Sequence, residues 1–433
     1  MKVSILSVFP DLYTSFIKTS LIQRAQDKGL VNFDIEGFFS YVKPKERIDA
    51  PSFGPGAGML IKPEVVEKSI EDKVQKHGSA FKIFFSPQGR KLNQKVLKEL
   101  AQKAIEKGHL MLIAARYEGM DSRVEEYYAD EVLSVGDFVV MGGDLPAMLF
   151  LEGLLRLVPG VVGKSESVER ESFSGPFVDY PEYTAPVIWK DRSVPDIVRS
   201  GNHAEIESWR MHQAAKKSIL YHFPWVRSCT MNNDQKTLAR QYIPPHYVVL
   251  LHSDVLIGED RKVGTTSVTS IDIHDIARSS ETYGVKTFFI VTPLLDQQKI
   301  VRKLLNFWTS EVGIDYNRHR HEAVRDVELQ ASLDDTIAQI ERVEHKAPIV
   351  IGTSAREISY AKQLSYEDQA KIWPLTRPIL LVFGTGKGLS EMVLKRCDYI
   401  LTPVEGFTDF NHLSVRSAVG IVLDRWLGIQ RKE

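Results

Sequence analysis

The chain has 433 residues, of which 43% are hydrophobic and 26% are charged, and its formal net charge is −1 at pH 7. This length is too great for one hydrophobic core, so we expect a globular protein of two to four domains. The balanced charge excludes a general attraction to nucleic acid, and any RNA binding must use local basic patches. Cys229 and Cys397 are too few for a zinc cluster or a disulfide framework, which favours a reducing cytoplasm. No apolar run reaches membrane-spanning length.

The first part of the chain alternates apolar runs with amphipathic segments. Strands are predicted at residues 3–8, 31–39, 81–86, 110–115 and 131–135, and helices at residues 12–28, 63–77 and 93–107. A flexible glycine-rich loop is predicted at residues 51–60. Strands that alternate with helices predict an α/β fold, with a mainly parallel sheet that is covered on both faces.

Three loops follow apolar strands in this part: SPQGRKL (86–92), ARYEGMDSR (115–123) and SVGDFVVMGGDLP (134–146). Loops beyond the carboxyl ends of parallel strands can converge on one ligand crevice. Gly136, Gly142 and Gly143 allow a close backbone approach, and a helix is predicted to begin near residue 145 with Asp144 as its cap. No G-x-G-x-x-G follows a strand here, which argues against a Rossmann-type site.

The next two segments differ in composition. Residues 161–185 are rich in Ser, Glu, Gly and Pro and are predicted to form a flexible linker or lid. Residues 191–242 are polar and helical, with basic side chains between aromatic ones: His203, Arg210, His212, Lys216 and Lys217 with Trp209, Tyr221 and Trp225. This pattern fits contact with an RNA backbone and bases, and it equally fits the solvated face of a small helical domain.

A second α/β domain is predicted from residue 243 onward. Strands are expected at residues 247–252, 286–291, 349–352, 379–383 and 399–403, and helices at 271–283, 297–308, 333–345 and 414–427. Residues 84–92 are similar in pattern to 381–389, and residues 130–155 to 398–423, which suggests two domains of one architecture. At the positions around GTGKGLS where a phosphate-binding loop needs Gly and then Ser or Thr, the chain has Leu381 and Gly388. This argues against a nucleotide-dependent kinase or ligase.

Five segments occur in the order and spacing of a known family: SPQGRKL, RYEGMDSR, SVGDFVVMGGDLPAM, RLVPGVVG and SGNHAEIESWR. They resemble the bacterial tRNA (guanine-N1)-methyltransferases of the TrmD family over about residues 1–240. The resemblance implies methylation of the guanine 3′ of the anticodon, position 37, with S-adenosylmethionine as the donor. It also implies a cytoplasmic homodimer with active sites built from both subunits, and a SPOUT fold with a trefoil knot.

The segments LLVFGTGKGL, DYILTPVEG and NHLSVRSAVGIVLDRWLG resemble a second SPOUT methyltransferase of unknown target. The predicted fold class is therefore α/β, with two SPOUT domains separated by a small helical domain. The predicted divisions are a donor-binding domain at 1–160, a linker at 161–178, a tRNA-binding domain at 179–242 and a second SPOUT domain at 243–433. An alternative is that the last domain is a non-catalytic RNA-binding or dimerisation module.

Methylation at guanine N1 requires a base for the N1 proton and a cation for the charge that develops toward O6. By their place in the family's motifs, the resemblance implies Arg156 as the cation and Glu171 as the base. The family has aspartate at the position of Glu171. Glutamate is one methylene longer, and its placement matters for rate. Glu169 and Asp179 are alternative bases.

The resemblance also implies the binding residues. S-adenosylmethionine is expected to contact Ser86, Pro87, Gly89, Ala115, Tyr117, Glu118, Gly119, Val135, Gly136, Asp137, Phe138, Val139, Val140, Gly142, Gly143, Leu145 and Pro146. Glu118 and Asp121 are candidates for the donor's amine or a magnesium ion. The tRNA is expected at Asn202, His203 and Arg210. In the second domain the donor is expected at Leu381, Gly384, Gly386, Gly388, Leu401, Pro403, Gly406 and Leu413. Candidates for catalysis there are Asn411, His412, Ser414 and Arg416, with helix capping as the alternative for Asn411 and Ser414.

Overall fold

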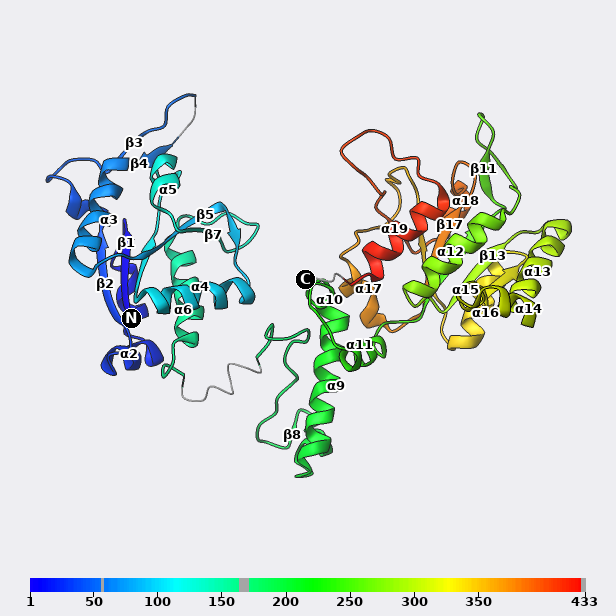
Figure 1. Ribbon diagram of the computed structural model, residues 1–433, viewed down its shortest axis with the longest axis horizontal. Coiled ribbons are helices and arrows are strands. Elements are labelled where there is room, and N and C mark those ends of the chain that lie inside the picture. Colours follow the sequence, from blue (N-terminus) through cyan, green and yellow to red (C-terminus); the bar gives the residue numbers. More distant parts are fainter. Residues whose placement is uncertain (56–57, 163–170, 430–433) are drawn as a thin grey trace. The chain divides into compact units, whose positions relative to one another are not determined.

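The computed structural model describes residues 1–55, 58–162 and 171–429. It divides into two compact units, Met1–Ser174 and Gly175–Glu433, which Figure 1 shows in the colours of the sequence. The alternative base Glu169, part of the predicted linker and part of the glycine-rich loop lie outside the described residues.

The first unit is built on a five-stranded sheet in the order β2-β1-β6-β5-β7. Every pairing in it is parallel. The strands are β1 (Lys2–Ser7), β2 (Asn32–Gly37), β5 (Phe81–Lys91), β6 (His109–Ile113) and β7 (Glu131–Ser134), and a small hairpin joins β3 (Asp49–Pro51) to β4 (Met59–Ile61). The predicted parallel sheet is confirmed.

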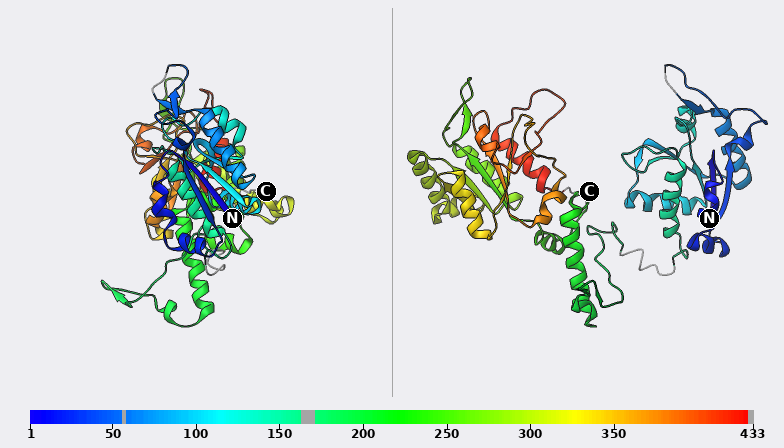
Figure 2. Two further views of the ribbon diagram at one scale, coloured as in Figure 1. Left: turned by 90° about the vertical axis from the view of Figure 1, so that its left-hand side faces the viewer. Right: turned by 180° about the vertical axis from the view of Figure 1, so that it is seen from behind.

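Helices cover both faces of this sheet (Figure 1 and Figure 2). One face packs on α1 (Leu12–Ile17), α2 (Ser20–Asp27), α4 (Gln94–Lys107) and α6 (Asp144–Leu157). The other packs on the 3₁₀ turn η1 (Phe38–Tyr41), α3 (Pro63–His77) and α5 (Ser122–Tyr128). The strands alternate accordingly: Val3 and Ile5 of β1 lie in the first core, and Leu6 lies in the second.

Two predicted elements of the first unit are wrong. The helix predicted at residues 12–28 is divided into α1 and α2, and the chain takes a positive φ of 32° at Ser20, the first residue of α2. The loop predicted at residues 86–92 is largely the end of β5, which pairs with β7 again after a register shift between Phe85 and Arg90. Gly89 permits this pairing, since a Cβ there would lie 2.6 Å from the carbonyl carbon of Val132.

The predicted capping role of Asp144 is also wrong. Gly143 is the N-cap of α6, and Asp144 is its first residue and fully buried. The Asp144 carboxylate accepts hydrogen bonds from Ser7 Oγ at 2.5 Å, Tyr13 Oη at 3.0 Å and Arg116 Nε at 2.8 Å. A buried carboxylate requires such partners, so tertiary contacts decide its role.

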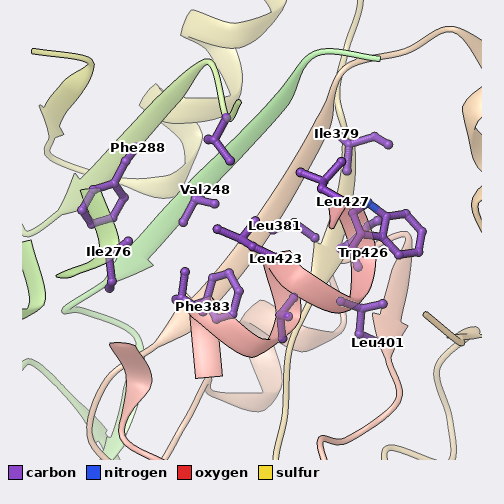
Figure 3. Close-up of a cluster of buried hydrophobic side chains, with 14 of the residues drawn as sticks. Val248, Ile276, Phe288, Ile379, Leu381, Phe383, Leu401, Leu423, Trp426 and Leu427 are labelled. Atoms are coloured by element: carbon purple, nitrogen blue, oxygen red, sulfur yellow. The ribbon is translucent and has the colours of Figure 1, made fainter. Parts of the chain in front are cut away.

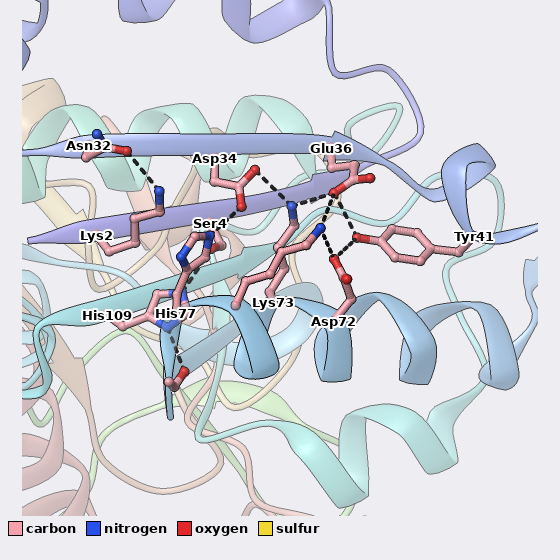
Figure 4. A network of polar contacts seen from close by, with 12 residues as sticks. Lys2, Ser4, Asn32, Asp34, Glu36, Tyr41, Asp72, Lys73, His77 and His109 are labelled. Carbon is pink, nitrogen blue, oxygen red and sulfur yellow. Dashed lines mark hydrogen bonds and ion pairs between the residues drawn. The ribbon is translucent and has the colours of Figure 1, made fainter.

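A buried ionic network joins α3 to the edge strand β2 (Figure 4). The Lys73 ammonium lies 2.8 Å from Asp34 Oδ1 and 2.5 Å from Glu36 Oε2, and the lysine side chain is only 1% exposed. His77 lies 2.6 Å from Asp34, and although burial opposes the shift, hydrogen bonds from Lys73 and His77 lower the pKa of Asp34. Charges on an edge strand disfavour pairing with another sheet.

The second unit has a seven-stranded sheet in the order β14-β13-β10-β17-β15-β18-β16. All pairings within it are parallel. The strands are β10 (His246–Leu251), β13 (Thr287–Val291), β14 (Val327–Gln330), β15 (Ile349–Gly352), β16 (Gln363–Leu364), β17 (Ile379–Gly384) and β18 (Tyr399–Leu401), and β11 (Val255–Ile257) forms a hairpin with β12 (Lys262–Gly264).

Helices cover both faces of this sheet as well. The larger core, part of which is drawn in Figure 3, lies under α9 (His203–Tyr221), α10 (Phe223–Arg227), α12 (Ser270–Thr282), α13 (Leu295–Thr309), α15 (Arg318–Val324) and α19 (Val415–Leu427). The opposite face packs on α16 (Leu333–Glu344) and α18 (Glu391–Leu394). The remaining elements are β8 (Ile188–Trp189), β9 (Arg192–Ser193), α8 (Asp196–Arg199), α11 (Asn233–Arg240), α14 (Glu311–Tyr316), α17 (Gln369–Ile372) and η2 (Trp373–Leu375).

The two large sheets share one topology. Numbered in chain order within each unit, the strands of the first sheet run 2-1-4-3-5. Strands β10, β13, β15, β17 and β18 have the same order, and β14 and β16 extend the sheet at its edges. The prediction of one repeated architecture is confirmed.

The shared topology corrects one of the two predicted correspondences. Residues 130–155 and 398–423 both contain the fifth strand and the following helix, as predicted. The match of 84–92 with 381–389 is wrong, because β5 is the third strand of its sheet and β17 is the fourth. The counterpart of the FGTGKGL loop is therefore the loop after β6. None of the described helices is long and apolar enough to cross a membrane.

Candidate active site

A cavity of about 340 Å³ lies beside the middle of β5 and beyond the carboxyl ends of β6 and β7. Its wall comes from the three segments that the sequence analysis selected, the first of which belongs to β5. The structure brings together most of the predicted donor-binding residues there: Ser86, Pro87, Ala115, Tyr117, Glu118, Gly119, Val135, Gly136, Phe138, Val139, Val140, Gly142, Gly143 and Pro146.

Three of the predicted residues do not line this cavity. Gly89 lies in the paired end of β5, Asp137 forms an ion pair with Lys91, and Leu145 is 62% exposed on α6. The cavity also includes residues that sequence reasoning missed, among them Arg116, Met120, Ser122 and Glu125. Arg116 and Met120 could have been found, because both belong to the RYEGMDSR motif.

Glycines bring two of the loops together, backbone against backbone. The amide of Gly143 donates to the carbonyl of Ala115 at 2.7 Å. A Cβ at Gly143 would lie 3.0 Å from the Cα of Ala114, and one at Gly142 would lie 2.5 Å from the Arg116 side chain. Apolar side chains such as Phe138 and Val140 stand beside this contact. A backbone cradle with an apolar wall suits a flat adenine ring, so these residues fit the predicted donor.

Buried electrostatics hold the loop after β6 in place. Arg116 donates to Asp144, and its guanidinium lies 5.0 Å from the ring centre of Phe9. Burial, the Asp144 charge and the hydrogen bond to Asp144 all raise the pKa of Tyr13, which remains a hydrogen-bond donor. The cavity wall is thus attached to the N-terminus of α6 by an ionic contact.

The predicted catalytic pair is in contact. The guanidinium of Arg156, in the last turn of α6, donates a hydrogen bond to the carboxylate of Glu171. Neither residue lines the cavity. Arg156 lies on the exposed face of α6 together with Leu145, Leu149 and Glu152, at helical spacing. The alternative base Asp179 belongs to the second compact unit.

The predicted tRNA-binding residues lie on or beside α9 in the second unit. Asn202 caps this helix, because its side chain accepts a hydrogen bond from the amide of Glu205 at 3.4 Å. His203 is the first residue of α9, and the Arg210 guanidinium lies 4.6 Å from the ring centre of Tyr180.

A second cavity, of about 740 Å³, lies beyond β15, β17 and β18. Of the residues predicted to hold the donor there, its wall contains Gly384, Gly386, Gly388, Leu401 and Leu413. Leu381 is instead buried in the core of β17, and Pro403 and Gly406 lie on the following loop outside the wall. Gly386 has a φ of 62°, and a Cβ there would lie 2.6 Å from the carbonyl oxygen of Leu256, so a side chain does not fit.

The candidate catalytic residues of the second unit have different roles. Ser414 caps α19 by accepting from the amide of Ser417, so its capping alternative is confirmed. Asn411 instead donates to the carbonyl of Ala355, which joins two loops of the cavity wall. His412 lines the cavity, and its ring packs edge-on against Phe410.

Sequence reasoning missed the loop after β15 and the N-terminal end of α12. Thr353, Ser354, Ala355 and Arg356 line the second cavity, as do Thr266, Ser267 and Asp272. Residues 349–356 have the same pattern that selected the other ligand loops, which is a short apolar strand followed by small and polar residues. Below this wall, His252 is fully buried, its Nδ1 lies 3.1 Å from Thr266 Oγ1, and burial lowers its pKa to about 4.

The described residues contain no cluster of three or more His, Cys, Asp or Glu side chains placed to hold a metal ion. Asp121 caps α5 and pairs with Arg123 at 2.7 Å. Glu118 lies under Gly58, where a Cβ would be 2.3 Å from the glutamate side chain.

Comparison with known proteins agrees with this geometry. The model of the tRNA (Guanine-1)-methyltransferase TrmD family matches residues 1–225, and that of a SAM-dependent RNA methyltransferase family matches residues 245–428. Proteins named tRNA (guanine-N(1)-)-methyltransferase are 35% identical in Nitratidesulfovibrio vulgaris and 36% identical in Oleidesulfovibrio alaskensis, each over 99% of both chains.

A protein of the same name in Bacillus subtilis is 38% identical over 51% of this chain and 90% of its own length. The two-unit organisation is therefore shared with some relatives, while others match one part of it. The chain belongs to the tRNA (guanine-1)-methyltransferase TrmD family, and its second half carries a SAM-dependent RNA methyltransferase domain.

Proposed function

We propose that the protein methylates N1 of guanine in tRNA, at position 37 beside the anticodon, with S-adenosylmethionine as the donor. The contact between Arg156 and Glu171 carries this proposal. Guanine N1 and O6 are attached to the same ring carbon, so one base and one cation must be neighbours to serve both atoms. The full-length relatives with the corresponding name support the same reaction.

The donor supplies a methyl group on a sulfonium. The residues of this chain accept the N1 proton and stabilise the negative charge that develops on the guanine. Glu171 takes the N1 proton as the new N–C bond forms and the S–C bond breaks. Arg156 stabilises the negative charge that moves toward O6. The first cavity positions the donor through the backbone of its glycine loops and the wall formed by Phe138, Val139 and Val140.

The active form is proposed to be a homodimer. The exposed face of α6 carries Leu145 and Leu149, which are 62% and 55% exposed, and the neighbouring loop exposes Val139 at 87% and Met141 at 85%. An apolar surface of this kind favours a protein interface. Because Arg156 lies on the same helix face, a second copy seated there would bring its own cavity wall to the catalytic pair. This explains why the pair does not line the cavity of its own chain.

Three further assignments belong to this proposal. Both units are SPOUT domains with a knotted C-terminal segment, which the contact between the loops at Ala115 and Gly143 and the repeated strand order support. Residues 179–242 form a helical domain that contacts tRNA through His203 and Arg210, joined to the first domain by the 161–178 linker. The magnesium ion that the family resemblance implies would be held at Glu118. The second unit is proposed to use its own cavity for the same donor.

Methyl transfer to an unmodified tRNA transcript tests the first reaction. We expect Glu171→Gln and Arg156→Ala each to lower the rate at least about a hundredfold, because general acid–base catalysis contributes 10² to 10⁴. Donor affinity, measured by calorimetry, is expected to stay within threefold. Glu64→Ala is the matched control, since Glu64 is exposed on α3, which covers the opposite face of the sheet from α6. A transcript with adenine at position 37 is expected to give no product.

Full activity of Glu171→Gln would contradict the assigned base, and parallel assays of Glu169→Gln and Asp179→Asn would show whether an alternative serves. Sedimentation tests the dimer separately. The wild-type protein is expected to sediment as a dimer, and Leu149→Glu as an inactive monomer. A monomeric and fully active wild-type protein would rule out a shared active site.

A further inference from the structure

The second cavity contains one carboxylate that the sequence analysis did not select. Among the described residues that line it, Asp272 is the only Asp or Glu. It is the third residue of α12, and it is 9% exposed, so its carboxylate lies at the inner wall of the cavity rather than at its rim. The donor loops after β15, β17 and β18 form other parts of the same wall.

A guanidinium stands beside this carboxylate. Arg416 Nη1 lies 3.5 Å from Asp272 Oδ1, and Arg416 Nε lies 3.5 Å from Oδ2 of Asp275, which does not line the cavity. Arg416 is the second residue of α19 and directly follows Ser414 and Val415, which do line it. The hydroxyl of Thr269 donates to the other Asp272 oxygen. Contacts to both oxygens hold the carboxylate in one orientation.

We infer that Asp272 is the catalytic base of a second RNA methyl transfer and that Arg416 positions it. This rests on the proposed function, in which the second unit binds S-adenosylmethionine. The substrate class is an RNA nucleotide whose acceptor atom carries a proton, on a ring nitrogen, an exocyclic amine or a ribose hydroxyl. As the acceptor bonds to the methyl carbon, the S–C bond breaks and leaves a thioether. The acceptor's proton passes to Asp272, which then releases it to water.

Two observations distinguish Asp272 from its neighbours. Its helical neighbour Asp275 contacts the same arginine but stands outside the cavity, so ion pairing alone does not define the site. His412 also lines the wall, but it is exposed, and its ring packs edge-on against Phe410 with 5.9 Å between ring centres. The pairing of a carboxylate with a guanidinium also repeats the chemistry of Glu171 and Arg156, from different elements of the fold.

The experiment uses the full chain and RNA from a strain that carries Asp272→Asn in its genome. Such RNA is expected to carry the methyl group that the first unit adds and to lack the one that the second unit adds. With tritiated S-adenosylmethionine, the wild-type protein is expected to label this RNA, and Asp272→Asn to label it at least a hundredfold more slowly. Asp275→Asn is the matched control and is expected to remain within threefold of the wild type. Asp272→Glu is expected to recover part of the rate, which loss of a purely structural contact would not predict.

Two results would overturn the inference. In the first, the wild-type protein labels the variant strain's RNA no more than it labels RNA from the unaltered strain. In the second, His412→Asn loses the labelling and Asp272→Asn keeps it. Calorimetry separates this inference from the proposed function. If the wild-type protein binds two donor molecules per chain but does not label the RNA, only the role assigned to Asp272 is refuted. If the wild-type protein lacks the second donor site, the function proposed for the second unit is refuted.

Discussion

The two units of this protein place a cavity at the same position of the same kind of sheet. Each has a parallel sheet with the strand order 2-1-4-3-5, and each has its cavity at the third, fourth and fifth strands. Their cavities differ in size, about 340 Å³ in the first unit and about 740 Å³ in the second. The shared sheet places the loops that line each cavity, and segments outside the shared strands line them differently.

The proposed catalytic groups illustrate that division. In the first unit the carboxylate of Glu171 follows α6, in the segment that leaves the sheet domain. In the second unit Asp272 lies on α12, which follows the first strand of the sheet. Arg156 stands at the end of its helix and Arg416 at the beginning of the corresponding one. The similarity between the units therefore extends to the place of the cavity on the sheet and not to the proposed catalytic residues.

The units also differ in what they bury. The first unit has the ionic network around Lys73 on its edge strand β2. The corresponding strand of the second unit, β13, is apolar and is flanked by β14. The second unit buries His246 and His252, and burial lowers the pKa of each to about 4, whereas the described part of the first unit buries His109.

The largest expected difference between the units is their response to acid. An unfolded histidine titrates near pH 6.5, above the native pKa of about 4 for His246 and His252, so the unfolded state binds protons more readily. Stability is therefore lost as the pH falls from about 6.5 to 4, by about 3 kcal/mol for each histidine at pH 4. Hydrogen exchange, corrected for its intrinsic rate, is expected to increase more in β10 than in β1.

His319 provides the control, because its side chain is 92% exposed and His319→Gln should leave this response unchanged. The first unit is expected to respond less, since in its described part burial lowers the pKa of one histidine, His109. Equal changes in β1 and β10 over this pH range would show that the buried histidines do not distinguish the units.

The next effect concerns the edge of the first sheet. Lys73→Met removes the ammonium and leaves Asp34 and Glu36 beside an apolar side chain. Loss of one partner from a buried ion pair costs about 3 to 5 kcal/mol, so β1 and β2 are expected to lose protection by that amount while β10 is unchanged. Lys76→Met is the control, because Lys76 is half exposed, and it is expected to cost less than about 1 kcal/mol. An unchanged stability of Lys73→Met would mean that the network does not hold the edge strand.

The smallest effect tests whether the two cavities are independent. Gly386→Ala places a side chain against the carbonyl of Leu256 at a positive φ, a strain of about 1 to 3 kcal/mol. We expect donor affinity to fall about tenfold to a hundredfold at one of two calorimetric sites and to stay constant at the other. Gly406→Ala is the control, since nothing lies within 4 Å of a Cβ there. Weakening of both sites would show that the units are coupled.

Much of this protein followed from local sequence. The helix at residues 63–77 and the strand at 349–352 were predicted to the residue, because hydrophobic periodicity and proline or glycine boundaries act over a few residues. The glycine loops at Gly142, Gly143 and Gly386 were also recognisable, since only glycine tolerates their backbone contacts. Arg156 and Glu171 were each selected from the motif positions of the family, and the structure places their side chains in contact.

Tertiary structure decided the rest. Sequence pattern matched residues 84–92, at the end of β5, with residues 381–389, yet the sheet order makes β6 the true counterpart of β17. The local sequence predicted Asp144 as a helix cap, and it did not indicate Asp272 as a site residue. The reason is physical: in a parallel sheet neighbouring strands are joined by long crossovers, so the partners of a buried carboxylate come from distant segments. Local periodicity determines which residues form a strand or helix, but only packing determines which charges meet.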